Sequence, residues 1–396
     1  MKCLVCGEIF DSSLEICPVC GVGKENFIEV EAEESAVLNN TEEYYVILGN
    51  GTAGFNAAKA IRERDKTGAV TIISDEEYPA YNRPMLTKSI VAGLSADQIA
   101  IVDPSWYEEN KVFQMLGKKV ASVDVNEKEV ILESGEKVHF TRLIYALGSE
   151  CFIPPIEGSS LPEVVAIRRL ADVEKLEKMM EHAAKAVVIG GGVLGLEAAW
   201  ELKKAGIDVQ VLEAAPILMG RQLDENASDI LRMFAEKSGV KISTGVSVEA
   251  VEGDGLDADR AVKVNERMET SVPNVYACGD CAEFNGANYA VWPEASEQGR
   301  IAGANAAGDQ IEYAATAPTL TFHGMNTALF AAGDNGKNPN LLYKTAEFKD
   351  MGKGRYSKYY FLNNRLAGVI MIGDLSDMVK ITEALEKHAL YKDVLG

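Results

Sequence analysis

YYVILGNGTAG, at residues 44–54, joins a hydrophobic run to a glycine-rich turn, and an alanine-rich segment of helical character follows it. Gly49, Gly51 and Gly54 give the spacing G-x-G-x-x-G. In a strand–turn–helix unit, the first glycine allows the tight turn and the second lets backbone approach a pyrophosphate. The third lets the helix pack on the strand, and free N–H groups at the helix N-terminus bind phosphate. The stretch therefore predicts a parallel α/β domain that binds a dinucleotide.

The same pattern recurs in AVVIGGGVLG, at residues 186–195, with Gly190, Gly192 and Gly195 in the equivalent positions. One copy is weak evidence, because glycine-rich turns arise for many reasons. Two copies, each between a strand-like and a helix-like segment, are strong evidence. Two bound dinucleotides in one chain indicate that electrons pass from one to the other.

Acidic residues after each glycine pattern indicate which dinucleotides bind. Glu213 ends the hydrophobic segment after the second pattern, where a carboxylate accepts the ribose hydroxyls of NAD, and no arginine follows it at once. NADH is therefore favoured over NADPH. After the first pattern Ser74 takes the equivalent place, so Asp75 or Glu76 would have to reach the ribose.

Three further segments carry a resemblance to a known family: PAYNRPMLTK (79–88), LIYALG (143–148) and TSVPNVYACGD (270–280). They resemble the FAD half of the pyridine-nucleotide-dependent flavoprotein reductases. Within that family the similarity is to NADH:rubredoxin oxidoreductases and to the flavin modules of assimilatory nitrite reductases, over roughly residues 42–396. The resemblance implies an α/β fold with two Rossmann-like domains, one for FAD and one, inserted into it, for NAD.

The resemblance also assigns cofactor-binding residues outside the glycine loops. Asp280 would bind the flavin ribityl chain, and Pro84 and Gly148 lie in motifs of the FAD half. Arg83 and Lys88 would line the flavin, where a positive charge near N1 stabilises the reduced form. The alternative is that both are solvated surface residues.

Two more residues have a functional and an ordinary interpretation. Trp292 would cover the edge of the isoalloxazine ring, or it is simply a core residue. Glu197, just after the second pattern, would contact the nicotinamide, or it is a helix-start glutamate favoured by the helix dipole. We expect no catalytic side chain, because electrons would leave through the flavin without a nucleophile. Cys278 and Cys281 are then interpreted as small buried residues.

The first residues predict a metal site. Two C-x-x-C motifs place Cys3, Cys6, Cys17 and Cys20 around one tetrahedral metal, either zinc or a single iron. The segment resembles the short rubredoxin-like module of rubrerythrins. Iron is favoured, because zinc has no redox chemistry to share with a flavin. A disulfide framework is less favoured, since no secretory signal peptide precedes the motifs.

The expected order of domains is a metal module (1–35), the first half of the FAD domain (42–155), the NAD domain (156–255), the second half of the FAD domain (256–318) and a small α+β domain (319–396). An acidic linker, residues 29–43, would span about 20 Å and let the module swing over the flavin. The NAD domain is expected to be truncated: about 35 residues that form a β-meander and the last strand of such a domain are missing.

Composition limits the function classes. The net charge of −21 argues against binding to nucleic acid or to anionic membranes, and no apolar run is long enough to span a bilayer. We expect a cytoplasmic enzyme that moves electrons from NADH through FAD to an Fe(Cys)4 centre or to a separate rubredoxin or similar small electron-transfer protein. The alternatives are a flavin reductase with a structural zinc knuckle and an FAD-binding redox sensor with impaired use of NADH. The oligomeric state is left open.

Overall fold

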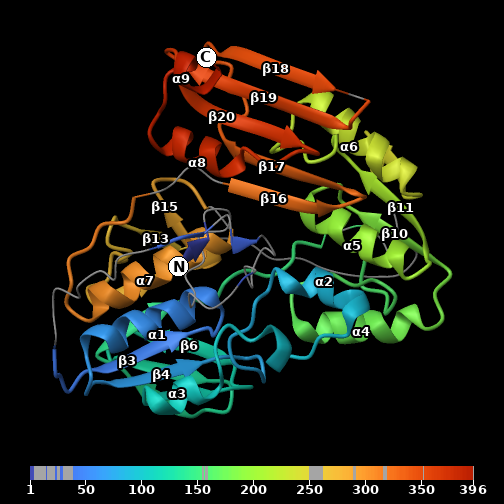
Figure 1. Cartoon of the computed structure of the whole chain (residues 1–396). Coiled ribbons are helices and arrows are strands. Elements are labelled where there is room, and N and C mark those ends of the chain that lie inside the picture. Colours follow the sequence, from blue (N-terminus) through green and yellow to red (C-terminus); the bar gives the residue numbers. More distant parts are fainter. Residues whose placement is uncertain are drawn as a thin grey trace.

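The computed structural model describes residues 1–3, 15, 23–24, 27–29, 39–153, 156, 159–248, 262–288, 291–314, 319–350 and 352–395. Of the N-terminal module it describes a two-stranded antiparallel sheet, in which β1 (Lys2–Cys3) pairs with β2 (Phe27–Ile28). The remainder forms three regions around a common centre (Figure 1).

The first region is a five-stranded parallel sheet in the order β14-β9-β3-β4-β5. Its strands are β3 (Tyr44–Leu48), β4 (Ala69–Ile73), β5 (Val112–Met115), β9 (Arg142–Tyr145) and β14 (Val275–Ala277). Strand β14 is distant in sequence, yet it pairs with β9, so the chain returns to this sheet after the second glycine pattern. The fold is therefore α/β and Rossmann-like here, as the first glycine pattern predicts.

Both faces of this sheet are covered. Helices α1 (Thr52–Arg64) and α7 (Trp292–Ala306) pack together on one face. On the other face lies an antiparallel meander, β6 (Val120–Asp124), β7 (Glu129–Leu132) and β8 (Lys137–His139). Shorter elements complete the region: α2 (Met85–Ala92), η2 (Asp97–Ile99), α3 (Ser105–Glu109), β13 (Val262–Val264), η3 (Gly279–Cys281) and β15 (Ala282–Phe284).

The second region contains a parallel sheet in the order β10-β11-β12. Its elements are α4 (Leu170–Met180), β10 (Lys185–Ile189), α5 (Val193–Lys204), β11 (Asp208–Glu213), α6 (Glu225–Lys237) and β12 (Lys241–Thr244). Strand β10 is an edge strand here, and its side chains Val187 and Ile189 are 60% and 44% exposed. Among the described residues no further strand covers that edge. Residues 249–261, on which the expected truncation falls, lie outside them.

The third region is a five-stranded antiparallel sheet, β16-β17-β20-β19-β18, with two helices. Its elements are β16 (Thr319–Gly324), β17 (Thr327–Gly333), β18 (Lys344–Asp350), β19 (Arg355–Leu362), β20 (Arg365–Ile372), α8 (Met378–Glu386) and α9 (Tyr391–Leu395). Asn363 and Asn364 adopt φ of 48° and 64° in the turn between β19 and β20, the conformation that tight hairpin turns require. Helix α8 begins after Asp377.

One hydrophobic core joins the second and third regions. It combines side chains of α5 and α6 with others of the antiparallel sheet, such as Phe322, Leu329 and Ile370. Asp224 strengthens this junction: it caps α6 by accepting from the Ala227 N–H (3.0 Å), and it accepts from Lys358 Nζ (2.5 Å). The C-terminal sheet is thus fixed to the helices beside the second glycine loop.

Candidate functional site

The first glycine loop has the geometry of a phosphate cradle. Gly49 has φ of +103°, and a Cβ on it would lie 2.1 Å from the Ala146 carbonyl oxygen. A Cβ on Gly54 would lie 2.0 Å from the Gly49 oxygen, so α1 can approach β3 only without a side chain there. At Gly51, which precedes α1, a Cβ would meet nothing within 4 Å. The helix N-terminus therefore opens onto free space, which suits a pyrophosphate.

The second loop repeats this geometry. Gly190 has φ of +110°, a Cβ on Gly195 would lie 2.0 Å from the Gly190 oxygen, and Gly192 again faces open space. Glu213 ends β11 beside this loop: its two carboxylate oxygens accept from the Gly191 and Ala215 N–H groups, both at 2.6 Å. A carboxylate has about four acceptor positions, so Glu213 keeps capacity for ribose hydroxyls.

Close packing of α1 and α7 brings η3, which contains Asp280, to the start of α1, since a Cβ on Gly279 would lie 3.0 Å from the Ala53 Cβ. A Cβ on Gly303 would lie 2.2 Å from the Ala57 oxygen, and one on Gly299 would lie 2.2 Å from the Ala53 oxygen. The Thr52 and Ser296 hydroxyls, one from each helix, lie 2.6 Å apart. Gly279, the residue before Asp280 in η3, donates its N–H to the side chain of Gln298 in α7 (2.9 Å).

Asp280 has partners that its sequence neighbourhood does not reveal. One oxygen of its carboxylate accepts from Arg168 Nη2 (2.9 Å) and from the Ser149 hydroxyl (3.0 Å). Gly148 lies against the same guanidinium, because a Cβ there would be 3.1 Å from Arg168 Nη2. Arg168 and Ser149 were not among the predicted site residues. No sequence motif links Arg168 to Asp280, because 112 residues separate them.

The acidic and basic residues after β4 are paired with each other. Asp75, 41% exposed, pairs with Arg169 at 2.8 Å, and Glu76 pairs with Arg83. Arg83 also donates to the carbonyl of Arg168 (2.8 Å). Asp75 is thus engaged by an arginine, and the Arg83 guanidinium connects the loop after β4 to the segment that leads into α4. Pro84 immediately precedes α2.

Helices of the two Rossmann-like regions meet at Glu197. Thr87 of α2 donates to the Glu197 carboxylate of α5 at 2.7 Å. Burial raises the pKa of Glu197 above its usual range, while this hydrogen bond and the charge of Lys88 oppose the shift. Burial and Lys88 both lower the pKa of His323, on β16. Lys88 and Glu197 are therefore brought together where α2, α5 and β16 converge.

Trp292 is the first residue of α7 and packs against the hydrophobic cluster of the C-terminal sheet and α8. Cys278 is fully buried, and burial raises the pKa values of Cys278, Cys281 and Cys151. Thiolate chemistry is disfavoured at all three, since the reactive form is the thiolate. Of the predicted metal ligands, Cys3 lies in β1, and Cys6, Cys17 and Cys20 lie outside the described residues. Four thiolates as a donor set suit iron and zinc alike.

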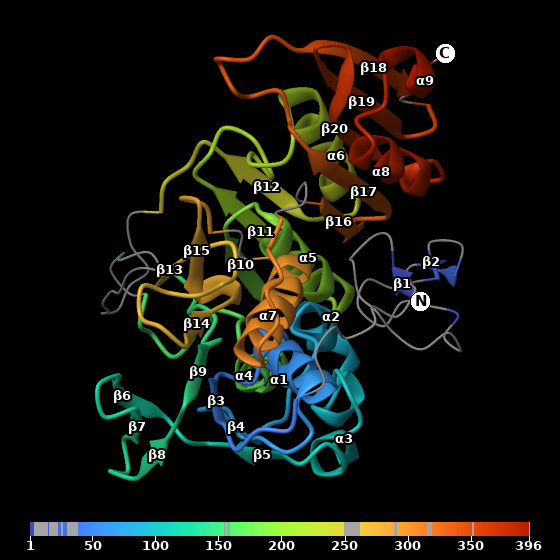
Figure 2. The same cartoon turned by 90° about the vertical axis from the view of Figure 1, so that its left-hand side faces the viewer.

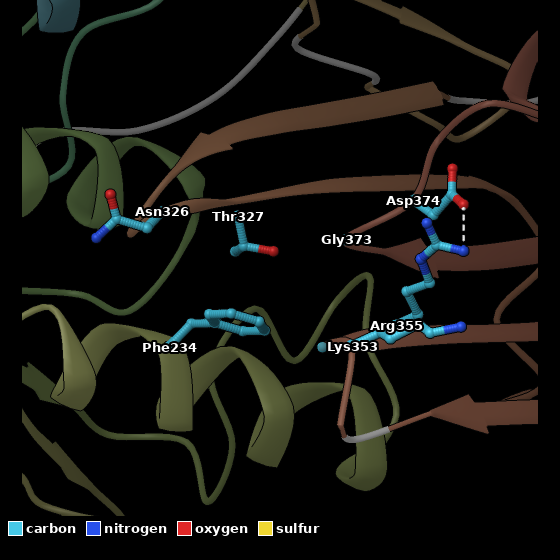
Figure 3. A pocket seen from close by; sticks show the side chains of 8 residues that line it. Phe234, Asn326, Thr327, Lys353, Arg355, Gly373 and Asp374 are labelled. Atoms are coloured by element: carbon cyan, nitrogen blue, oxygen red, sulfur yellow. Dashed lines mark ion pairs between the residues drawn. The ribbon is translucent and has the colours of Figure 1, made fainter.

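A cavity of about 320 Å³ lies between α6 and the C-terminal sheet (Figure 3). Phe234 forms one wall, and Arg355 and Asp374, paired at 3.0 Å, lie at the other side. Its lining contains none of the residues predicted to bind FAD or NADH. The glycine loops and the convergence at Glu197, rather than this cavity, form the candidate site.

Comparison with known proteins agrees with this geometry. The model of the pyridine nucleotide-disulphide oxidoreductase family matches residues 44–259 and 254–299. The chain belongs to this family. Two further models match the ends of the oxidoreductase: the C-terminal domain of rubredoxin NAD+ reductase at residues 318–389, and the rubredoxin-like domain of rubrerythrin at residues 2–28. The α/β fold and the resemblance to flavoprotein reductases are both confirmed.

Individual relatives agree with the family. The NADH-rubredoxin oxidoreductase of Clostridium acetobutylicum is 30% identical, over 88% of this chain and 96% of the relative. A crystal structure of NADH:rubredoxin oxidoreductase from that species covers 90% of this chain and 98% of its own, with a TM-score of 0.75 and 28% identity. The assimilatory nitrate reductase electron transfer subunit of Bacillus subtilis is 29% identical over 87% of this chain and 49% of the relative. The chain thus spans about half the length of some curated relatives that it matches.

The described helices include none that is both long and apolar enough to cross a membrane.

Proposed function

We propose that this oxidoreductase takes electrons from NADH and passes them through FAD to a rubredoxin-type centre. The acceptor is the Fe(Cys)4 centre of its own N-terminal module or a separate rubredoxin-like protein. One observation carries the proposal: the two glycine loops have the same geometry, and their regions meet at the Thr87–Glu197 hydrogen bond. Two relatives are named for electron exchange between NAD and rubredoxin.

Each part of the chain has a defined role in this proposal. The α1 N-terminus and Asp280 hold FAD, and the α5 N-terminus and Glu213 hold NADH. When bound, FAD supplies the conversion of a hydride into two single electrons. Lys88 adds positive charge beside Glu197, where the two cofactors would meet, and this charge favours the reduced flavin. No thiol is needed, which agrees with the raised pKa values of Cys151, Cys278 and Cys281.

Anaerobic titration with NADH tests the proposal. Purified protein should carry about one FAD and one iron, and NADH should bleach the flavin absorbance first and the iron absorbance second. A protein that keeps its flavin but ignores NADH would instead be the redox sensor. Zinc recovered after anaerobic expression with added iron would favour a module that serves only for docking.

A further inference from the structure

The two-stranded N-terminal sheet of β1 and β2 does not lie free of the reductase. Phe27 of β2 is partly buried, and it packs against the hydrophobic cluster formed by the C-terminal sheet and α8. Members of this cluster include Phe330, Phe361, Met378 and Ile381, and Trp292 of α7 packs against the same cluster. In both views β1 and β2 lie beside the C-terminal domain, near β16 and α8 (Figures 1 and 2). The linker length alone predicts a module without a fixed interface.

The pairing register of β1 and β2 places this contact next to a predicted metal ligand. Phe27 pairs with Cys3, and Ile28, the next residue of β2, is 41% exposed. Directly opposed residues of an antiparallel pair have Cα atoms about 4.5–5.5 Å apart. The anchor at Phe27 therefore also fixes the backbone of Cys3, the first of the four predicted metal ligands.

The tether is short. Asn39 is already bound to the FAD region, since its N–H donates to the Arg64 carbonyl (2.6 Å) and its Nδ2 to the Ala307 carbonyl (2.9 Å). Residues 30–38 thus connect β2 to Asn39, which is held by the FAD region. A fully extended chain of that length reaches about 35 Å at most. Tethers of this kind give effective concentrations in the millimolar range, so a small contact suffices to hold the module.

The contact is apolar rather than electrostatic. Residues 1–35 contain eight acidic side chains and two lysines, and the whole chain carries a net charge of −21. Like charges oppose association of the module with the rest of the chain. Burial of the apolar surface of Phe27 favours it.

We propose that Phe27 docks the metal module on the hydrophobic cluster of the C-terminal domain, against which Trp292 also packs, so that the chain is its own first electron acceptor. Trp292 starts the helix that packs on η3, the element that contains Asp280. Docking therefore holds the Cys3 end of the module toward the FAD-binding half. The electron-transfer part of this proposal rests on the proposed function, whereas the docking contact does not.

Hydrogen exchange measured on the full chain by mass spectrometry tests the contact without relying on activity. Phe27→Ala should speed exchange about tenfold in peptides covering residues 291–300 and 374–386, because the cover is lost. Ile28→Ala, on the exposed side of the same strand, and Phe27→Leu, which keeps apolar bulk, should match the wild type. Cys17→Ser, in which we expect the module to unfold, gives the undocked reference.

Wild-type exchange equal to that of Cys17→Ser would overturn the docking proposal, as would equal exchange in Phe27→Ala, Ile28→Ala and the wild type. Iron content of each variant shows that the module is intact. A single-turnover measurement then separates the two proposals. Phe27→Ala should slow bleaching of the iron by about tenfold and leave bleaching of the flavin by NADH unchanged. If these peptides are protected but NADH never reduces the iron, the docking proposal stands and the proposed electron transfer from FAD to iron is contradicted.

Discussion

At the scale of single residues, the proposed recognition of the two dinucleotides depends on two carboxylates. Asp280 and Glu213 each lie beside a glycine loop, but their partners differ. Asp280 is held by the side chains of Arg168 and Ser149, whereas Glu213 is held by backbone N–H groups. The first arrangement depends on residues far apart in sequence, and the second is local to the loop.

Asp280→Ala should lose most of its FAD. Removal of a charged acceptor costs about 1.5–3 kcal/mol per hydrogen bond, which corresponds to roughly 10- to 100-fold weaker binding. The flavin-to-protein ratio after purification and FAD titration of the deflavinated protein measure this loss. Asp97→Ala is the matched control, because this aspartate is exposed and lies outside the residues predicted to bind FAD. Full flavin occupancy in Asp280→Ala would contradict the assignment.

Glu213 should decide between NADH and NADPH. Glu213→Ala should raise the KM for NADH by about tenfold, because the ribose loses an acceptor and the loop loses its support from Glu213. Glu213→Gln keeps an acceptor for one N–H but removes the charge that repels a 2′-phosphate, so use of NADPH should increase. Steady-state kinetics with both cofactors measure these changes. Equal use of NADH and NADPH by the wild type would refute the role of Glu213.

At the scale of elements, the contact between α1 and α7 shapes the site that we propose for FAD. Both helices present small residues to each other, which allows their backbones to approach closely. This contact joins the helix that follows the first glycine loop to the helix that follows Asp280. A change in helix spacing should therefore affect FAD binding as well as stability.

Gly303→Ala tests the packing of these helices. The new methyl group would lie 2.2 Å from the Ala57 oxygen, so the helices must separate. We expect a loss of about 1–3 kcal/mol in unfolding free energy and weaker retention of FAD. Thermal denaturation and the flavin ratio are the measurements. Gly352→Ala adds the same methyl group at an exposed position outside the left-handed region and should change neither.

Asp65, after α1, should make this region sensitive to acid. Burial by itself would raise its pKa, but hydrogen bonds from Gly68, Thr41 and Thr67 lower the pKa to about 2 from its usual 3.8. The stabilisation is therefore complete above pH 4 and is lost as the pH falls toward 2. Asp65→Asn should cost about 2 kcal/mol at pH 7 and much less near pH 2. Urea unfolding at both pH values checks this, with exposed Asp97→Asn as the control.

At the scale of the whole molecule, three regions and a metal module are joined by contacts of unequal extent. The region of the second glycine loop and the C-terminal sheet share one core. The module is joined through Phe27 and a short tether. Loss of the module should therefore leave the rest folded, since separate folding units lose stability independently.

Cys17→Ser should lose the metal and keep the flavin. A four-thiolate site with one ligand removed binds metal far more weakly, and a module of this size needs its metal to fold. Metal analysis should return less than one atom per chain while the FAD ratio stays near one. NADH should still bleach the flavin. Loss of FAD in this variant would show that the module and the reductase fold as one unit.

Much of the site could be predicted from sequence because its motifs are local. The glycine loops depend on backbone conformations that neighbouring residues specify, and Glu213 is placed by the length of one βαβ unit. The Asn363–Asn364 hairpin follows from the same kind of local preference. Asp280 was identified through the resemblance to a family, on a motif that is itself contiguous.

What the tertiary structure alone decided are the contacts between distant segments. Arg168 meets Asp280 across 112 residues, Thr87 meets Glu197 across 110, and Phe27 packs against the same hydrophobic cluster as Trp292. The tertiary structure also decided that Asp75 pairs with Arg169 and that Arg83 pairs with Glu76. The sequence by itself determined two dinucleotide loops and a four-cysteine motif, since short-range backbone geometry encodes them. How these parts face one another depends on how the helices and sheets pack, and no local pattern specifies that packing.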